Sequence, residues 1–234
     1  MKMAYDCEFS LVIPFYNEEQ NAEAVLKSLS KELDAGGFDY EIVAVDNGSR
    51  DATPDILKSV SGSNRRVKIA TIGNNEGYGW GITNGFRSAS GRYVGFMCGD
   101  GQISPSDVAR VLRRINDEHL DFCKVKRVVR RDGLNRKLMS VGYNILLPLL
   151  FGIKTADING TPKVMKRELY DRLDIRSKDW FIDTEMMVKV QRLKARTGEV
   201  EVEFLKRERG RSNVRFIIIL EFLKNLLRFR LGST

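Results

Sequence analysis

Polar residues that could bind a ligand follow three short apolar runs in the first half of the chain. The runs at 11–13, 42–45 and 93–97 lead into Pro14-Phe-Tyr-Asn-Glu18, Asp46-Asn-Gly-Ser49 and Cys98-Gly-Asp-Gly-Gln102. Short apolar runs bounded by turn residues are typical of buried parallel strands, and ligands bind beyond the carboxyl ends of such strands. Carboxylates there would suit a ligand that offers hydrogen-bond donors, such as a base or ribose, or one that arrives with a divalent cation.

Alternating strands and helices must position these residues. The pattern predicts strands at 8–13, 40–45, 67–72 and 93–97, and helices at 17–35, from 51 or 53, at 78–88 and at 104–118. This alternation favours an α/β fold with a Rossmann-like, mostly parallel sheet and helices on both faces. Later in the chain we expect a strand at 122–129, helices at 134–151, 183–197 and 214–230, and an edge strand at 199–204.

Composition narrows the class of protein. The 234 residues include 39 Lys and Arg against 31 Asp and Glu, which gives a net charge of +8 and favours an anionic partner. No recognised nucleic-acid-binding motif accompanies the charge, so we expect no nucleic-acid partner. The cysteines, which are Cys7, Cys98 and Cys123, are odd in number and scattered. Such cysteines argue against a disulfide framework or a zinc site and fit a reducing cytosol.

Several motifs, taken in order, resemble those of family 2 glycosyltransferases. Val12-Ile-Pro-Phe-Tyr-Asn-Glu18 is similar to the family's opening strand and loop, and Asp46-Asn-Gly-Ser-Arg-Asp-Ala-Thr53 to its Asp-Asp-Gly-Ser-x-Asp-x-Thr signature. Asn75-Glu-Gly-Tyr-Gly79 is similar to a glycine-rich stretch, and Cys98-Gly-Asp100 stands where the family carries Asp-x-Asp. Arg209-Gly-Arg-Ser212 resembles a late motif of the polyprenyl-phosphate, dolichyl-phosphate mannosyltransferase-like branch.

The resemblance implies a GT-A fold that transfers a sugar, with inversion, from a nucleoside-diphosphate sugar. Mg²⁺ or Mn²⁺ would be held by Asp100 and Gln102 against the diphosphate, and this makes Asp100 a catalytic candidate. The residues implied in donor binding are Pro14, Tyr16, Glu18, Asp46, Gly77, Asp100, Gln102 and Arg209.

Two residues depart from the family pattern. Cys98 replaces the first acid of Asp-x-Asp, and Asn47 replaces the second acid of the earlier signature. A neutral thiol is a poor ligand for a hard cation. Any metal would then rest on Asp100, water and phosphate oxygens, so that either it binds more weakly or nearby basic groups share the neutralisation of charge.

The acceptor side is rich in arginine. A phosphate monoester is already anionic near neutral pH, so as an acceptor it needs positioning more than deprotonation. The resemblance assigns Arg136 and Ser140 to the lipid phosphate, and we expect Arg127, at the end of the strand at 122–129, and Ser212, in the late motif, to bind the acceptor as well. Two further catalytic candidates, Asp183 and Glu185, fall near the family's acidic helix start; we expect Glu185 to position the site and Asp183 to be a base if the acceptor is a hydroxyl.

Two segments with apolar faces flanked by Lys and Arg, 134–151 and 214–230, are predicted to be interfacial helices. We expect one GT-A domain over residues 1–212, which includes the first of them, and a C-terminal basic amphipathic helix at 213–234. No signal-peptide pattern and no apolar run of about 20 residues is present. The sequence therefore predicts a cytoplasmic protein, peripheral on an anionic membrane surface, with a membrane-protein partner or a homo-oligomer as alternatives.

Other interpretations remain open at this point. The acceptor could be a glycan hydroxyl, and Cys98 is compatible with a non-catalytic nucleotide-sugar-binding protein. Asp46 and Asp100 could be turn residues, and Tyr16 could serve packing alone. The basic runs could be solvated surface, and the apolar tail could dock on the domain itself or on a second subunit.

Overall fold

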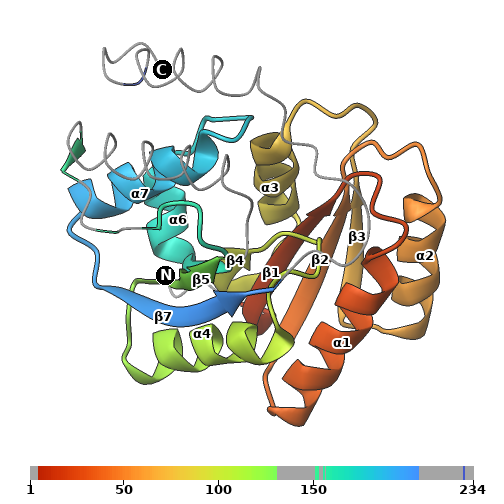
Figure 1. Ribbon diagram of the computed structural model, residues 1–234, viewed down its shortest axis with the longest axis horizontal. Helices are drawn as coiled ribbons and strands as arrows, with labels where there is room; N and C mark the ends of the chain where they lie inside the picture. Colours follow the sequence, from red (N-terminus) through yellow and green to blue (C-terminus); the bar gives the residue numbers. More distant parts are fainter. Residues whose placement is uncertain (1–4, 131–150, 153–154, 156, 206–228, 230–234) are drawn as a thin grey trace.

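The computed structural model describes residues 5–130, 151–152, 155, 157–205 and 229. This part contains a seven-stranded sheet in the order β3-β2-β1-β4-β6-β5-β7 (Figure 1). β6 runs antiparallel to β4 and β5, and the other neighbouring strands are parallel. The strands are β1 (Cys7–Phe15), β2 (Tyr40–Asp46), β3 (Val67–Thr71), β4 (Gly91–Phe96), β5 (Phe122–Arg130), β6 (Lys163–Lys166) and β7 (Thr197–Phe204).

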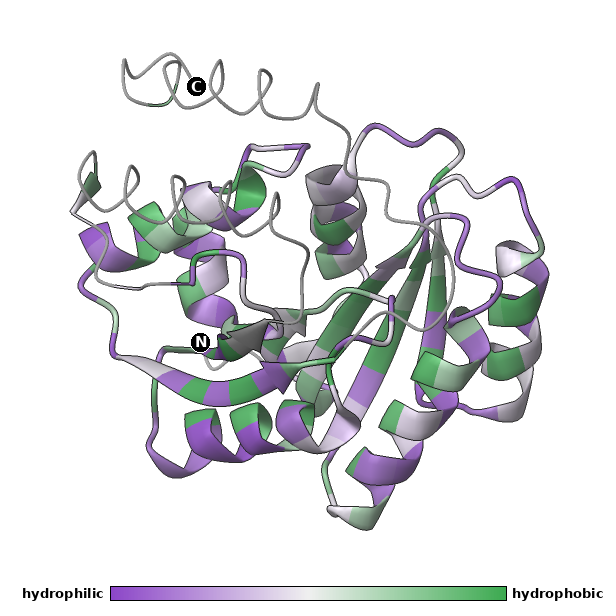
Figure 2. Ribbon diagram, in the orientation of Figure 1, coloured by the Kyte–Doolittle hydropathy of each residue, from purple (hydrophilic) through white to green (hydrophobic). Residues whose placement is uncertain are grey.

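Helices cover both faces of the sheet, as the alternation predicts. One face packs against α1 (Ala22–Ala35), α2 (Thr53–Ser63) and α4 (Pro105–Asp117). The other packs against α3 (Tyr78–Arg87), α6 (Arg167–Leu173) and α7 (Ile182–Arg192). The central strands are coloured mainly hydrophobic in Figure 2, which is expected of parallel strands that are buried on both faces. The predicted α/β class is therefore confirmed.

The first helix begins later than predicted. We expected it from Asn17, but α1 starts at Ala22, and Asn17 adopts a positive φ of 53°. The loop instead bonds across to the segment that follows β2. Asn17 N–H donates to Ser49 Oγ (3.1 Å), and Glu18 N–H donates to Thr53 Oγ1 (2.9 Å). These partners satisfy backbone N–H groups that would otherwise belong to a helix. Hydrogen bonds therefore hold the loops after β1 and β2 together.

β6 and α6 lie in a region where we predicted no regular structure. The four residues of β6 are two apolar residues between two lysines, a pattern with no clear period of its own. The strand forms because it fits between β4 and β5, with Lys163 opposite Phe96 and Val164 opposite Gly95. Its position next to β4 brings residues 157–163 to the carboxyl end of the sheet.

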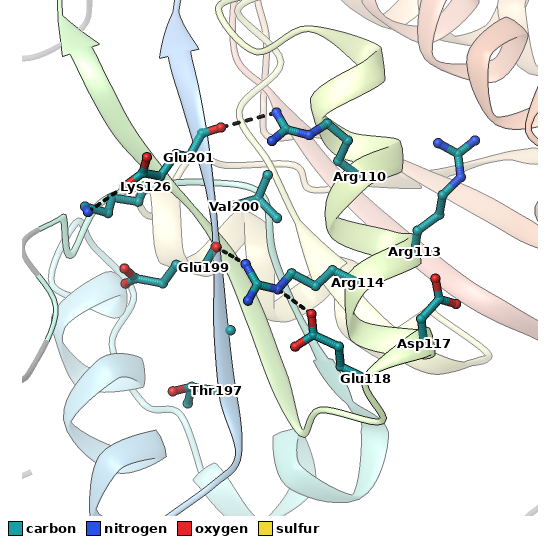
Figure 3. Close-up of a pocket in the computed structure, with 11 residues that line it drawn as sticks. Arg110, Arg113, Arg114, Asp117, Glu118, Lys126, Thr197, Glu199, Val200 and Glu201 are labelled. Atoms are coloured by element: carbon teal, nitrogen blue, oxygen red, sulfur yellow. Dashed lines mark hydrogen bonds and ion pairs between the residues drawn. The ribbon is translucent and has the colours of Figure 1, made fainter.

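The predicted edge strand is confirmed as β7. Val200 and Val202 are buried, while Glu201 and Glu203 between and beyond them are exposed. Two arginines of α4 cover its open side: Arg110 donates to the Glu201 carbonyl and Arg114 to the Glu199 carbonyl (Figure 3). The two guanidinium groups thus occupy carbonyls that could otherwise pair with another strand. Among the described residues, no helix combines the length and hydropathy needed to cross a bilayer.

The contact of α3 with the sheet gives a test of this packing. A Cβ at Gly85 would lie 2.3 Å from Val12 Cγ1 and 2.8 Å from Val45 Cγ2, so Gly85→Ala must push α3 away from β1 and β2. We expect a loss of about 1–3 kcal/mol in the free energy of unfolding, measured by urea denaturation. Gly62→Ala in α2 is the matched control, because a Cβ there meets nothing within 4 Å. The control should be neutral or stabilising by up to about 1 kcal/mol; equal effects of the two changes would contradict this account.

Candidate active site

The loop that follows β2 is closed by a carboxylate. Asp46 is buried, and its Oδ1 accepts the Ser49 N–H at 2.9 Å. Asn17 Oδ1 accepts the Arg50 N–H at 2.8 Å from the loop that follows β1. Asp46 is therefore a turn residue, as one interpretation held, and it also stands at the carboxyl end of β2, beside the β1 loop. That loop carries Tyr16 and Glu18, and Pro14 lies near the end of β1 itself; all three are partly exposed.

The glycine-rich turn before α3 is packed against residues 174–181, which we call the strap. Gly77 has a φ of 123°, and a Cβ there would lie 2.5 Å from the Lys178 carbonyl oxygen. Trp80 N–H donates to that same carbonyl at 2.8 Å, and Asn47 Nδ2 donates to the Gly77 carbonyl at 3.1 Å. Only glycine fits at this position, because both its backbone angle and the available space exclude a side chain.

The strap is fastened to α7 by Glu185. This buried carboxylate accepts the N–H groups of Arg176 and Ser177 at 2.8–3.2 Å, and the Lys189 ammonium group at 2.6 Å. On the strap, the Trp180 ring stacks on Tyr78 with a centroid separation of 4.5 Å. Glu185 thus holds the backbone of the strap in place, and the positioning role expected for it stays a prediction.

The loop that follows β4 carries Asp100 and Gln102. Gln102 N–H donates to Asp100 Oδ1 at 3.1 Å, and the Gln102 side-chain amide donates to the Leu205 carbonyl at 2.9 Å. Leu205 N–H in turn donates to the Gln102 carbonyl at 3.0 Å. The end of β7 is therefore tied to this loop. A cavity of about 750 Å³ lies beside Asp100, between α1 and the start of α4.

Cys98 lies in a neutral, hydrogen-bonded setting. Its Sγ is 3.4 Å from the Tyr78 hydroxyl and 3.8 Å from Thr161 Oγ1. Burial, aided by the negative charge of Asp100, raises the pKa of Cys98 to about 12, so the group is an uncharged thiol at pH 7. The first acid of Asp-x-Asp is therefore replaced by a group without charge.

Buried ion pairs line the other side of the site. Arg127 makes a bidentate pair with Asp157, through bonds of 2.9 and 2.6 Å, and its guanidinium lies over the Phe204 ring. Asp183, in the first turn of α7, is paired with Lys163 of β6. Burial alone would raise the pKa of Asp157, but the hydrogen bonds and charge of Arg127 outweigh it and hold that pKa at about 2.

Sequence reasoning did not identify several of these residues. Tyr78, Asp157, Thr161 and Lys163 were not site candidates, and Trp180 could equally have been core. Their partners are 20 or more residues away along the chain, so no local motif marks them. The site candidates Arg136, Ser140, Arg209 and Ser212 lie outside the described residues, and so do the predicted helices at 134–151 and 214–230 apart from Phe151 and Phe229.

The donor set for a divalent cation is small. Within the part of the chain that the structure describes, no group of three or more His, Cys, Asp and Glu side chains is placed to hold a metal by itself. Asp100 offers one carboxylate, and Gln102 offers a side-chain carbonyl, which are oxygen donors of the kind that Mg²⁺ and Mn²⁺ prefer. These residues fit a cation whose remaining ligands come from substrate phosphates and water.

Comparison with known proteins identifies the family. Residues 10–174 match the family described as glycosyl transferase family 2. The chain belongs to this family. The match covers β1 to the start of the strap and includes the loops after β1, β2 and β4, so the glycosyltransferase activity expected from the motifs is confirmed.

Named relatives of this glycosyltransferase act on polyprenyl phosphates. It is 28% identical to a dodecaprenyl-phosphate galacturonate synthase of Rhizobium johnstonii, over 95% of this chain and 68% of the relative. It is also 28% identical to an undecaprenyl-phosphate 4-deoxy-4-formamido-L-arabinose transferase of Proteus mirabilis, over 93% of this chain and 66% of the relative. The chain thus spans about two thirds of the length of these relatives.

Solved structures confirm the GT-A fold of the glycosyltransferase. A glucosyl-3-phosphoglycerate synthase from Mycobacterium tuberculosis, in complex with Mn²⁺, UDP-glucose and phosphoglyceric acid, gives a TM-score of 0.72 at 20% identity. That match covers 97% of this chain and 80% of the other. A mannosyltransferase from Pyrobaculum calidifontis, in complex with GDP-Man and Mn²⁺, gives a TM-score of 0.64 at 19% identity. That match covers 90% of this chain and 62% of the mannosyltransferase chain.

The Arg127–Asp157 pair predicts how stability depends on pH. Because the pKa of Asp157 is lowered in the folded state, the pair stabilises the fold above the unfolded pKa of about 4 and loses this effect as the pH falls towards 2. We expect Asp157→Asn to lower the free energy of unfolding at pH 7 by about 2 kcal/mol or more. The difference from wild type should shrink below pH 4, as followed by denaturant titration at several pH values.

The exposed pair of Lys126 and Glu201, also anchored on β5, is the control for this experiment. Glu201→Gln should leave the denaturation midpoint almost unchanged, since exposed ion pairs contribute little to stability. A difference between Asp157→Asn and wild type that stayed constant down to pH 2 would contradict the prediction.

Proposed function

We propose that this glycosyltransferase moves a sugar, with inversion, from a nucleoside diphosphate to polyprenyl phosphate. The donor half rests on one observation: Asp46 and Asp100 follow β2 and β4, the two strands that flank β1, so both carboxylates border the loop with Tyr16 and Glu18. The acceptor half rests on relatives named for polyprenyl-phosphate substrates, which align with 93–95% of this chain.

On the donor side, Asp46 and Glu18 accept hydrogen bonds from the base and ribose, with Tyr16 and Pro14 beside them. The family resemblance also assigns Gly77 to donor binding, and its lack of a side chain lets the glycine-rich turn pack against the strap. Asp100 and Gln102 would hold Mg²⁺ or Mn²⁺, which supplies positive charge to the departing diphosphate when bound. The family resemblance assigns Arg209, which lies outside the described residues, to the same diphosphate.

On the acceptor side, Arg127, Arg136, Ser140 and Ser212 would bind the lipid phosphate. Arg127 already shares its charge with Asp157, so Arg136 and the two hydroxyl groups carry more of this role. A phosphate oxygen then attacks the anomeric carbon on the face opposite to the diphosphate. The new C–O bond forms as the bond to the diphosphate breaks, and no proton has to be removed from the nucleophile.

An aromatic cluster packs one residue of each predicted interfacial segment against the domain. Phe151 and Phe229 stand near the ends of the two segments predicted to be interfacial, and their ring centroids are 5.8 Å apart. Phe229 also lies 5.4 Å from Phe181, which directly precedes α7. Both predicted interfacial segments therefore have an end beside the helix that carries Asp183 and Glu185. We propose that the protein is peripheral on an anionic bilayer, where its lipid substrate resides.

A panel of substrates tests the proposed function. UDP-, GDP- and CDP-sugars are incubated with and without polyprenyl phosphate, in vesicles of neutral or anionic lipid, with Mg²⁺, Mn²⁺ or a chelator. We expect nucleoside diphosphate to be released only when the lipid phosphate is present. The rate of release should be higher on anionic vesicles. It should fall at least about tenfold when the chelator is added.

The dephosphorylated polyprenol is the matched control acceptor in this panel. Release that is as fast with the alcohol as with the phosphate would favour a hydroxyl-acceptor enzyme. Donor binding without release under any condition would favour a non-catalytic nucleotide-sugar-binding protein.

The neutral Cys98 predicts weak metal binding. Cys98→Asp places a second carboxylate two residues from Asp100, and we expect it to tighten Mn²⁺ binding in the presence of the nucleoside diphosphate by about tenfold. Titration calorimetry measures the affinity directly, without turnover. Cys98→Ser is the control: it keeps the site neutral and should change the affinity less than about twofold. Equal metal affinity in Cys98→Asp and wild type would count against a metal site at this loop.

A further inference from the structure

A buried charge pair lies under the acceptor side of the site. Lys163 is fully buried, and its ammonium group is bonded to Asp183 Oδ1, whose side chain is 5% exposed. The ammonium group also lies 5.4 Å from the centroid of the Phe96 ring. Taking both charges out of water is costly, and an apolar pair of similar size is often as stable. Stability alone therefore gives no reason for these two residues.

The surroundings of the pair connect it to the reaction centre. Asp183 interacts electrostatically with Tyr78 of α3, with Cys98 after β4 and with Arg127 of β5, while Lys163 interacts with Lys124 of β5. Tyr78 and Cys98 are in hydrogen-bond contact with each other, and Cys98 is two residues from Asp100. The Asp183 carboxylate thus acts electrostatically both on residues next to the Asp100 loop and on the arginine assigned to the acceptor.

The pair changes what Asp183 can do. A general base must present a free carboxylate oxygen to the nucleophile and must accept its proton. Asp183 is almost completely buried and bonded to an ammonium group. If it accepted a proton, the buried Lys163 would lose its counter-charge, which is costly in a dry interior. Asp183 is therefore poorly placed to act as a general base.

We propose that Lys163 is a positioning residue that neutralises Asp183 and thereby makes the site selective for an anionic acceptor. This inference rests on the proposed function and adds the reason for its choice of acceptor. The charge of Asp183 is balanced by Lys163, and Cys98 is an uncharged thiol. Neither position 183 nor position 98 therefore repels an approaching phosphate. The same arrangement does not help a hydroxyl acceptor, because a hydroxyl group needs a general base to remove its proton and the paired Asp183 does not supply one.

Removing Lys163 should leave the Asp183 carboxylate without a counter-charge. In Lys163→Met, the unpaired Asp183 repels the lipid phosphate, and we expect the KM for polyprenyl phosphate to rise by about tenfold or more. The KM for the nucleotide-sugar should change less than about twofold, and kcat less than about threefold. A purely structural role of the pair would not separate the two substrates in this way.

Two further variants keep the test independent of folding. Lys163→Met leaves a buried charge and can lower stability, whereas the double variant Lys163→Met/Asp183→Asn removes both charges. We expect the double variant to bring the acceptor KM back to within about threefold of wild type. Lys163→Arg, which keeps the charge, should show the same recovery. Melting curves of each variant establish that the comparison is made on folded protein.

Lys166→Met is the matched control. Lys166 lies on the same strand and pairs with Asp121, but at the opposite end of β6 from the site. Its loss should leave both KM values unchanged. A rise in the acceptor KM in this control equal to that in Lys163→Met would overturn the proposal.

Three results separate the possible failures. If wild type uses polyprenyl phosphate but Lys163→Met has an unchanged acceptor KM, the role of Lys163 is wrong and the proposed function stands. If Asp183→Asn lowers kcat by about a thousandfold and abolishes the acidic limb of the pH–rate profile, Asp183 is the base and the inference fails. If wild type uses only hydroxyl acceptors, both proposals fail.

Discussion

Buried charges that must be paired hold the functional end of this glycosyltransferase together. Arg127 with Asp157, Lys163 with Asp183 and Lys189 with Glu185 each join a strand or helix to another segment or brace a loop against it. Lys163 and the carboxylates of Asp157, Asp183 and Glu185 are too deeply buried to be left without a partner. The pairs therefore fix where residues 157–163, the strap and the start of α7 lie relative to the sheet.

The donor side is organised differently, by close approach of backbone. The loops after β1 and β2 bond to each other, and the glycine-rich turn fits against the strap only because position 77 has no side chain. Tyr78 links the two sides, because its ring stacks on Trp180 while its hydroxyl contacts the Cys98 thiol. A displacement of the strap would thus reach the Asp100 loop through the stacking of Trp180 on Tyr78 and the contact of Tyr78 with Cys98.

The distribution of charge gives the site its chemical character. On the proposed donor side, Asp46 and Asp100 offer carboxylates, which would suit the hydroxyl groups of a nucleotide-sugar and a phosphate-bound cation. Towards α7, the carboxylates of Asp157, Asp183 and Glu185 are all bonded to cationic side chains, and the thiol of Cys98 carries no charge. This asymmetry favours a site that receives a nucleotide-sugar with its cation on one side and an anionic nucleophile on the other.

The sequence by itself determined the order of strands and helices, the GT-A family, and the polar residues at the ends of β1, β2 and β4. Local hydrophobic patterns and turn residues encode these features within a few neighbouring positions. Only the tertiary structure decided the start of α1 at Ala22, the insertion of β6 beside β4, and the partners of Lys163 and Arg127. Each of those depends on groups 20 or more residues away, which become neighbours only when the sheet is assembled and water is excluded.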